Sequence, residues 1–137
     1  MSAFEIAPPN LSLDALRDVA GRHYGIAGSL RALNSERDQN TRIDTGTARY
    51  VLKIVNAGED ADLVALQDAV ILHLAQAQAP GIPRLVPTLQ GANNAAEPVA
   101  GQSCLVRLVT YLDGITLSQS PRSLVQLRNL GAFMGRV

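Results

Sequence analysis

A predicted β-hairpin within residues 33–55 constrains the fold of this chain more than any other feature. Two segments rich in β-forming residues, 41–44 and 48–55, flank a short turn that contains Gly46. Glycine readily adopts the positive φ angle that such a turn requires, so the two segments are predicted to pair as antiparallel strands. We therefore expect the rest of the sheet to be organised around this hairpin.

The second strand of the hairpin carries an isolated positive charge. Because side chains alternate between the two faces of a strand, Lys53 points away from the face that carries Leu52 and Ile54. A lysine in this position most often extends along an exposed face to solvent. A functional role requires a polar loop that folds over the same face and brings an anionic ligand to the amine. Residues 34–40 form a polar segment of this kind.

The remaining sequence predicts an α+β domain. Segments 25–33, 85–90 and 103–112 bring the predicted antiparallel sheet to five strands. Residues 91–102 are mostly small and are expected to form a mobile loop. Apolar residues recur at helical spacing in three further segments. These helices are predicted to begin at Ser12, at Asp60 and at Pro121 or Ser123, and the second of them to run to about Gln78.

The composition excludes several classes of partner. The 137 residues carry a formal net charge of zero and no cluster of basic residues, so electrostatic capture of nucleic acid or of an anionic membrane is not expected. No apolar stretch is long enough to span a bilayer, and a cytoplasmic location is expected. The lone Cys104 is predicted to lie in the core, without a disulfide or a metal site. His23 is predicted to be structural or solvated.

The order of polar loop, strand lysine, helix and apolar strand resembles the nucleotide-binding lobe of the protein-kinase-like fold. The loop Ser-Glu-Arg-Asp-Gln-Asn at residues 35–40 is similar to the aminoglycoside phosphotransferase family. It is most similar to the hydroxylysine-kinase-like branch and to phosphotransferase domains fused to class III aminotransferases. The resemblance implies that residues 1–114 form the nucleotide-binding lobe with its hinge strand. Residues 115–137 would then be a linker and the first helix of a truncated C-terminal lobe.

The resemblance also implies a nucleotide site. Lys53 would contact the phosphates of ATP or GTP, and the loop with Asn34 and Ser35 would cover them. Val51 would line the adenine slot.

The strand end at residues 108–114 resembles the hinge of the family, which closes in a similar Asp-Gly turn. By this match the Thr110 carbonyl and the Leu112 amide would bond the edge of the adenine. Without the family pattern, the same residues are a buried strand followed by an ordinary turn.

One position departs from the kinase-like pattern, in which a helix glutamate pairs with the strand lysine. Alignment of the second helix places Gln67 at that position, and a neutral amide offers no charge pairing. Gln67 is the favoured partner of Lys53, and Asp68 is the alternative. We expect this helix to pack on the face of Leu52 and Ile54, with Lys53 on the opposite face beneath the loop. Lys53 on the same face as Leu66 and Val70 of this helix would overturn the assignment of a nucleotide site.

The catalytic part of the family pattern has no counterpart in this sequence. The family uses a His-x-Asp loop and a metal-binding aspartate in its second lobe, whereas His23 and His73 each lack an aspartate two residues later. No catalytic residue and no metal ligand is therefore assigned. Mg²⁺ would accompany the nucleotide in the intact protein, and the fragment is expected to be inactive and to fold without a cofactor.

Three interpretations follow. The leading one is that the chain is the nucleotide-binding lobe of a small-molecule phosphotransferase. The intact protein would move the γ-phosphate of ATP or GTP to a hydroxyl of a small amine-bearing substrate. A hydroxy-amino acid or an amino alcohol is such a substrate. A kinase-like interaction or regulatory module, with or without a fused aminotransferase, is the alternative. The third is an unrelated α+β domain with Lys53 in open solvent. The apolar stripe of the last helix predicts self-association of the fragment.

Overall fold

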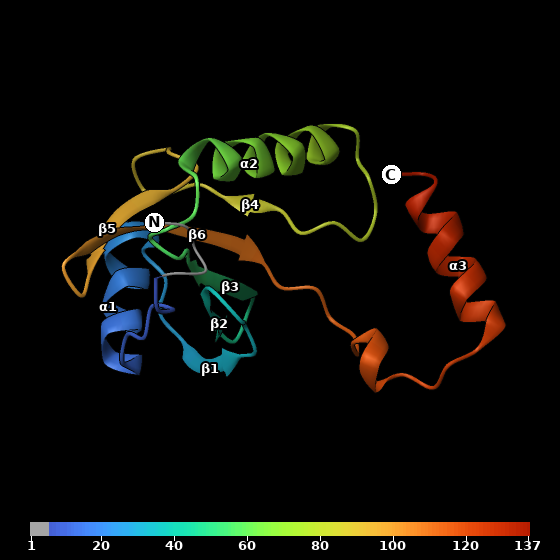
Figure 1. Cartoon of the computed structure of the whole chain (residues 1–137), viewed down its shortest axis with the longest axis horizontal. Helices are drawn as coiled ribbons and strands as arrows, with labels where there is room; N and C mark the ends of the chain where they lie inside the picture. Colours follow the sequence, from blue (N-terminus) through green and yellow to red (C-terminus); the bar gives the residue numbers. More distant parts are fainter. Residues whose placement is uncertain (1–5) are drawn as a thin grey trace.

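The structure, a computed structural model, describes residues 6–137 and shows a sheet with one helix on each face (Figure 1). Six antiparallel strands form this sheet, in the order β1-β2-β3-β6-β4, and β5 pairs with the first half of β6. The predicted α+β class is confirmed, with six strands in place of five. The elements are α1 (Leu13–Tyr24), β1 (Ser29–Leu33), β2 (Gln39–Asp44), β3 (Arg49–Ile54), α2 (Ala61–Gln76), β4 (Leu85–Val86), β5 (Ala95–Val99), β6 (Gln102–Thr110), η1 (Leu117–Gln119) and α3 (Leu124–Met134).

The predicted helix starts are confirmed. The hydroxyl of Ser12 caps α1 by accepting a hydrogen bond from the Ala15 N–H. Asp60 and Ser123 cap α2 and α3 in the same way. The first helix ends where Gly25 adopts a φ of 66°, in the left-handed region that glycine tolerates. Local capping chemistry therefore sets where these helices begin.

The segment 91–102 was expected to be a mobile loop, and this expectation is wrong. It contains β5, which turns directly into β6, since Val99 lies opposite Gln102. The two turn residues, Ala100 and Gly101, have φ angles of 49° and 79°, as a two-residue hairpin turn requires. Alanine rarely adopts a positive φ. The sequence at this turn therefore lacks a dipeptide such as Asn-Gly, which would have predicted a hairpin.

Two strands are shorter than predicted. β1 begins only after Gly28, where the backbone passes so close to β2 that a Cβ atom would lie 2.1 Å from the Asp44 carbonyl oxygen. β4 ends before Pro87, which has no N–H to donate to a ladder. Glycine and proline thus mark the limits of the sheet at both places.

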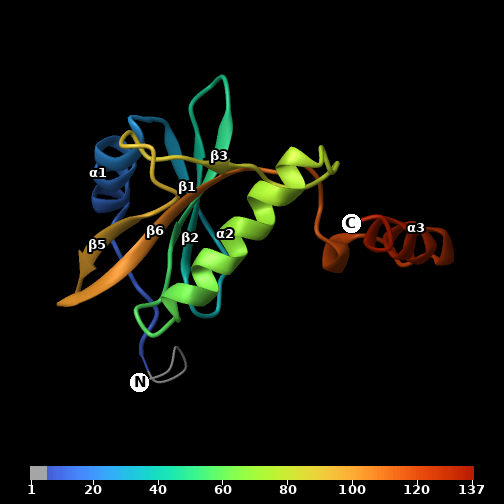
Figure 2. The same cartoon turned by 90° about the horizontal axis from the view of Figure 1, so that it is seen from above.

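The alternation of side chains divides the sheet into two faces. On one face α1 packs against the main core, which includes Leu52 and Ile54. Cys104 is part of this core, as predicted, and burial raises the pKa of its thiol. α2 lies across the opposite face (Figures 1 and 2). The other core residues include Leu16, Val19, Ala20 and Tyr24 of α1 and Ile43, Val106 and Leu108 of the strands.

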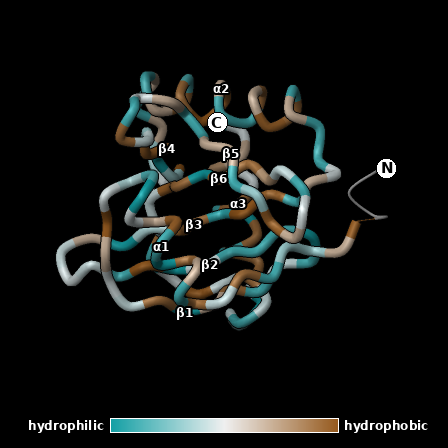
Figure 3. Tube along the Cα trace, turned by 90° about the vertical axis from the view of Figure 1, so that its left-hand side faces the viewer, coloured by the Kyte–Doolittle hydropathy of each residue, from teal (hydrophilic) through white to brown (hydrophobic). Residues whose placement is uncertain are grey.

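The expectation that α2 covers the face of Leu52 and Ile54 is wrong. α1 has a narrow stripe of apolar side chains that seals this face. α2 buries only Val64 and Asp68 and leaves apolar residues such as Val70 exposed. Figure 3 shows hydrophobic and hydrophilic residues alternating along α2. The sequence-based assignment favoured the more apolar helix, whereas the face that a helix covers depends on how its apolar residues are arranged.

α3 extends away from the sheet (Figures 1 and 2). None of its residues is buried, although Phe133 lies against the segment that precedes β4, where a Cβ atom on Gly81 would be 3.4 Å from the ring. Within the described residues, most of the apolar surface of α3 therefore has no intramolecular partner. The exposed apolar residues of this helix are Leu124, Val125, Leu127, Leu130 and Met134.

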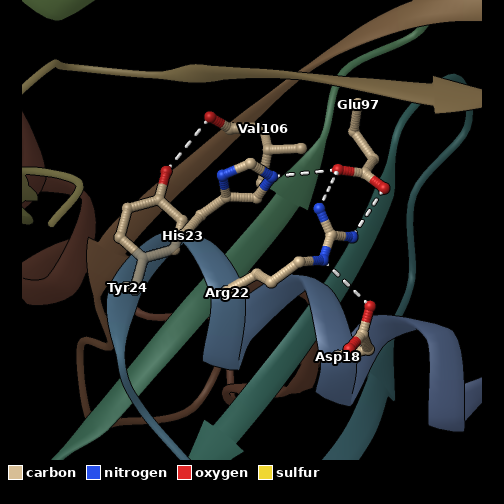
Figure 4. A network of polar contacts seen from close by, with 6 residues as sticks. All are labelled: Asp18, Arg22, His23, Tyr24, Glu97 and Val106. Atoms are coloured by element: carbon tan, nitrogen blue, oxygen red, sulfur yellow. Dashed lines mark hydrogen bonds and ion pairs between the residues drawn. The ribbon is translucent and has the colours of Figure 1, made fainter. Parts of the chain in front are cut away.

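A polar network joins the end of α1 to β5 (Figure 4). The carboxylate of Glu97 accepts hydrogen bonds of 2.8 and 3.2 Å from Arg22 and lies 2.9 Å from Nε2 of His23. Asp18 holds the same arginine at 3.0 Å. The hydrogen bond from Arg22 lowers the pKa of Glu97. His23 is thus a structural residue, one of the two roles predicted for it.

Tyr24 connects the same end of α1 to β6. Its hydroxyl donates a hydrogen bond of 3.1 Å to the Val106 carbonyl (Figure 4). Burial raises the pKa of Tyr24 to about 12. The last turn of α1 is therefore attached to two neighbouring strands.

Replacement of Glu97 by Gln is expected to lower the free energy of unfolding by about 1–3 kcal/mol near neutral pH, because charge-assisted hydrogen bonds are lost. The pKa of Glu97 is lower in the folded protein than in the unfolded chain. Its stabilising contribution is therefore present above the unfolded pKa and disappears as the pH falls through the folded value. Urea unfolding across this range should show the two proteins converge in acid.

Asp14→Asn is the matched control, since it removes an ion pair with Arg17 in which the Asp14 side chain is 94% exposed. This change should leave the unfolding transition nearly unaltered. An equal loss in both variants, or a difference that persists unchanged in acid, would contradict the role of the network.

Candidate functional site

Lys53 lies in the middle of a row of polar residues on the face that α2 covers. It is opposite Asn40 on β2 and opposite Arg107 on β6. Directly opposite residues share a face of the sheet, so the three side chains lie side by side. Together with α2 this face forms an open groove of about 430 Å³. The groove is lined by Lys53, Leu66, Gln67, Val70, Ile71, Pro83, Arg107 and Val109.

The structure therefore corrects the expected position of Lys53. The lysine was expected on the face opposite α2, yet it lines the same groove as Leu66 and Val70. The reason is that α1 takes the face of Leu52 and leaves the other face to α2. The expectation also conflicted with the pairing that the resemblance implies, because a helix can reach the strand lysine only from the same side. The criterion that Lys53 on this face would overturn the site was therefore wrong, and the nucleotide site stays a prediction.

Lys53 is the only lysine in the sequence. Its side chain is half-buried, and it forms no ion pair with any residue between 6 and 137. The side-chain oxygen of Asn40 beside it is buried without a hydrogen-bond partner in the same part of the chain. A cation that lines the groove and an amide oxygen on the neighbouring strand therefore have no partner among the described residues.

Neither Gln67 nor Asp68 bonds Lys53. Both bond Arg107: its Nη1 donates to the Gln67 oxygen at 3.0 Å, and its Nη2 lies 2.5 Å from the Asp68 carboxylate. Asn94 donates to the second Asp68 oxygen at 3.2 Å. The side chains of Arg107 and Asp68 are only 4% and 1% exposed. The charged contact between α2 and the sheet is therefore a buried ion pair with β6.

Arg107 was missed as a site residue, although the sequence contains a signal for it. It interrupts the apolar run Cys-Leu-Val-Arg-Leu-Val at residues 104–109. A charge inside a buried strand is stable only with a partner of opposite charge, which here is Asp68. Asp68 was the alternative partner predicted for Lys53, and the structure pairs it with Arg107 instead.

The polar loop is shorter than predicted and is held at its base. β1 ends at Leu33 and β2 begins at Gln39, which leaves residues 34–38. The Asn56 N–H donates to the Asp38 carboxylate at 3.0 Å, and the Asn56 side chain donates to the Arg37 carbonyl at 3.2 Å. Asn56 lies two residues after the end of β3, so these bonds couple the loop to the strand that carries Lys53.

A second pocket, of about 700 Å³, lies between β1, β2 and the segment after β6. Arg42 stacks over the Tyr111 ring at 4.9 Å from the centroid, and Arg49 pairs with Asp113 at 2.6 Å. These contacts attach the segment after β6 to the hairpin. The pocket is lined by Arg31, Ala32, Leu33, Asn34, Arg42, Tyr111, Leu112, Asp113, Gly114, Ile115, Thr116 and Gln119.

A charged turn lies next to Arg42, which lines this pocket. The Gly46 N–H donates to Asp44 at 2.9 Å, and Arg42 donates to it at 3.2 Å. The bond from Gly46, followed by that from Arg42, lowers the pKa of Asp44. Asp44 therefore balances one of the two arginines that line the pocket.

The structure divides the predicted site residues between these two places. Lys53 and Gln67 line the groove under α2, and Asn34 and Leu112 line the second pocket. Val51 lies between them, since its partners Arg42 and Val109 belong to the second pocket and to the groove.

Two predicted residues do not line either place. Ser35 lines a separate pocket on the side of α1. Thr110 ends β6 opposite Tyr50, with its N–H and hydroxyl both bonded to the backbone of Arg84. The hydrogen bond from the adenine edge to the carbonyl oxygen of Thr110 stays a prediction.

Two kinds of site have no candidate in the described part of the chain. No group of three or more His, Cys, Asp or Glu side chains is arranged to hold a metal ion. No helix there is long and apolar enough to cross a membrane.

The model of the phosphotransferase enzyme family (APH) matches residues 29–137, which include the groove and the second pocket. The chain belongs to this family. The match confirms the resemblance at the level of this family. No curated protein matches the chain.

Three solved structures share the fold. A microcompartment-associated aminopropanol kinase superposes with a TM-score of 0.68 at 17% identity, over 88% of this chain and 38% of that chain. The amicoumacin kinase, in complex with AMP-PNP and Ca²⁺, gives 0.60 at 16%, over 79% and 34%. Spectinomycin phosphotransferase, in complex with ADP and spectinomycin, gives 0.65 at 14%, over 88% and 36%. The chain thus spans little more than a third of the length of these phosphotransferases.

Replacement of Asp68 by Ala is expected to lower the free energy of unfolding by about 3–5 kcal/mol, because it leaves the buried Arg107 guanidinium without its counter-charge. Urea unfolding measures this loss. Asp62→Ala is the control on the same helix: this aspartate is exposed in the first turn, and its removal should have a much smaller effect. Similar losses in the two variants would show that Arg107 does not depend on Asp68.

Proposed function

We propose that this chain is the nucleotide-binding lobe of a small-molecule kinase. In the whole protein, the γ-phosphoryl group of ATP or GTP would pass to a hydroxyl of a small amine-bearing substrate. The observation that carries this proposal is the half-buried Lys53, which lines a groove without an ion pair to any described residue. An unpaired amine in such a groove attracts an anion, and family membership makes nucleotide phosphates the first candidates.

The two pockets correspond to the two ends of a nucleotide. The purine would lie in the second pocket, where the Leu112 N–H is bonded to none of residues 6–137 and can donate to the ring. Val51 would contact the base from the sheet. The phosphates would then extend to Lys53 in the groove. Phosphoryl transfer depends mainly on positioning and charge neutralisation, and these residues supply both.

The nature of the acceptor rests on similarity. One structural neighbour is named as a kinase of aminopropanol, a compound that contains an amine and a hydroxyl. The loop at residues 35–40 favours the branch of the family that acts on hydroxy-amino acids or amino alcohols. A fused class III aminotransferase and a cytoplasmic location belong to the same proposal.

Mg²⁺ would arrive with the nucleotide. The described residues hold no cluster of metal ligands, so none of them is assigned to the ion. This chain would contribute the charge of Lys53 and the hydrogen bonds to the base. The catalytic base of the reaction is not assigned to any residue here.

A non-catalytic module is the second candidate. One observation favours it: Gln67, at the position of the helix glutamate, is neutral and bonds Arg107. Lys53 therefore has no helix carboxylate that orients it. Such a module could retain nucleotide binding without transfer. Activity of the whole protein distinguishes the two functions.

The 137-residue chain is expected to bind ATP with a Kd of about 1 mM, or about −4 kcal/mol, because it offers only part of the contacts of a complete kinase cleft. Lys53→Ala should weaken this binding by about tenfold. Calorimetry measures the affinity, and selective ¹³C-lysine labelling gives a side-chain NMR signal from Lys53 alone. In the whole enzyme the same change should chiefly reduce phosphoryl transfer.

Arg128→Ala is the control for this experiment. It removes a positive charge from α3, outside both pockets, and should leave ATP binding unchanged. Micromolar ATP binding that survives Lys53→Ala would contradict the proposed site.

The chain is also expected to self-associate through the apolar side chains of α3, since exposed contiguous apolar surface tends to be buried by association. Sedimentation should show oligomers for the natural sequence and monomers when Leu127 and Leu130 are both changed to Glu. Changing Ile115 and Leu117 to Glu adds the same charge outside this helix and should leave the oligomers intact. A monomer at high concentration in the natural sequence would contradict this expectation.

A further inference from the structure

Asn56 is a polar residue that is almost completely buried, with only 2% of its surface exposed. The residue before it, Val55, donates its N–H to the Leu105 carbonyl of β6 at 2.8 Å, so the sheet fixes the position of Asn56. A buried amide is costly unless its polar groups find partners. All four polar groups of Asn56 are hydrogen-bonded, the N–H and carbonyl of its backbone and the two ends of its side-chain amide.

The partners of Asn56 come from three segments of the chain. Its backbone N–H donates to the Asp38 carboxylate at 3.0 Å, and its side-chain amide donates to the Arg37 carbonyl at 3.2 Å. The same amide donates to the Ile6 carbonyl at 3.1 Å, in the segment that precedes α1. Two N–H groups of the turn that follows Asn56 satisfy its two oxygens, each at 2.9 Å. One residue therefore joins the base of the polar loop, the N-terminal segment and the end of β3.

The N-terminal segment, residues 6–11, contacts the loop at a second point. The Gln39 side chain, at the start of β2, accepts from the Leu11 N–H at 2.8 Å and donates to the Leu11 carbonyl at 2.9 Å. Residues of this segment and Ser35 of the loop line a common pocket. Asn34, by contrast, lines the second pocket. The N-terminal segment thus supports the loop on the side away from the proposed nucleotide.

The loop leaves the sheet in the row of residues that contains Lys53. β1 ends at Leu33, which lies opposite Asn40, and Asn40 lies opposite Lys53. A displacement at the base of the loop would therefore move its tip relative to the lysine. The base is the part that Asn56 holds.

We propose that Asn56 is a positioning residue of the nucleotide site, which holds the base of loop 34–38 against the end of β3 and keeps the loop in place for phosphate at Lys53. A loop that is ordered in advance loses less entropy when it closes on a ligand. This inference rests on the proposed function for its biological meaning. One of its tests needs no nucleotide.

The decisive comparison is between two variants at Asp38, whose carboxylate accepts the hydrogen bond from the Asn56 backbone. Asp38→Asn keeps an oxygen that accepts this bond, whereas Asp38→Ala does not. Both variants lose the same charge, so a difference between them reports the hydrogen bond. Asp38→Ala should weaken Mg·ATP binding by about fivefold, because the released loop must be ordered on binding, and Asp38→Asn should stay within about twofold of the natural sequence. Equal affinities in the two variants would overturn the proposal.

Two partial ligands show whether the loss concerns the phosphate end of the nucleotide. Inorganic tripolyphosphate carries only the phosphate charges, and adenosine carries only the base and its sugar. In Asp38→Ala the affinity for tripolyphosphate, followed by the NMR signal of the Lys53 side chain, should fall as the affinity for ATP does. The affinity for adenosine, followed at the Leu112 amide, should stay unchanged. An equal loss for both partial ligands would contradict a role at the loop.

Asn56→Ala tests the node itself, because it removes the side-chain amide and keeps the backbone N–H. It should show the same selective loss for ATP and tripolyphosphate. Thermal unfolding monitors its folding, since the loss of buried hydrogen bonds is destabilising. Glu97→Gln is the matched control: it weakens the network between α1 and β5, outside both pockets, and should leave ATP affinity unchanged. An equal loss of affinity in the folded Glu97→Gln variant would show that binding follows stability alone and would overturn the proposal.

A further readout needs no nucleotide. The ¹⁵N relaxation of the backbone amides of residues 34–36 reports their motion on the picosecond to nanosecond timescale. These amides should become more mobile in Asp38→Ala and in Asn56→Ala, and should keep the mobility of the natural sequence in Asp38→Asn. Unchanged mobility in folded Asp38→Ala would overturn the proposal.

The experiments separate this inference from the proposed function. If Lys53→Ala weakens ATP binding while the two Asp38 variants bind alike, the inference fails and the nucleotide site is upheld. If Lys53→Ala does not change ATP affinity, the proposed nucleotide site fails. The relaxation experiment then still decides whether Asn56 holds the loop in place.

Discussion

The alternation of side chains along β3 and β6 is the constraint on which the rest of the structure depends. Each strand places apolar residues on one face and charged residues on the other, so Leu52 and Leu108 enter the core whereas Lys53 and Arg107 face α2. The apolar face is closed by α1 through hydrophobic burial. A helix on the other face must compensate a buried guanidinium, and Asp68 allows α2 to do so. The two helices are therefore held by different physical interactions.

This difference has a consequence for the groove. α2 buries only two side chains, and its side-chain bonds to the sheet within residues 6–137 come from Arg107. Elements with few buried apolar contacts lie at the low-stability end of a fold. Because the anchoring arginine is on β6 and not on β3, α2 is positioned without the use of the lysine charge. Under the proposed function, helix attachment and phosphate binding would fall to neighbouring residues on adjacent strands.

Local signals in the sequence predicted most of the elements, and tertiary relations accounted for the errors. The turn at Gly46, the caps at Ser12 and Asp60 and the side of the strand on which Lys53 lies each depend on a few neighbouring residues. Which helix covers which face depends on long-range packing, and the more apolar helix was assigned to the wrong face. The hairpin between β5 and β6 was missed because Ala100 adopts a positive φ angle, which the residue type alanine does not predict.

The sequence named candidate site residues without their arrangement, and Ser35 and Thr110 line neither the groove nor the second pocket. The family resemblance named Lys53 and the residues of the hinge, whereas Arg107 follows only from asking what neutralises a charge in an apolar strand. Its pairing with Asp68 also bears on the choice between a binding site and a structural lysine. A lysine that served only the fold would be stabilised by sharing the nearest buried carboxylate. In this structure that carboxylate is occupied from two sides, by Arg107 and Asn94, and the uncompensated charge lies where the groove meets the second pocket through Val51. A ligand with an anionic end and a planar, hydrogen-bonding end matches this distribution of charge.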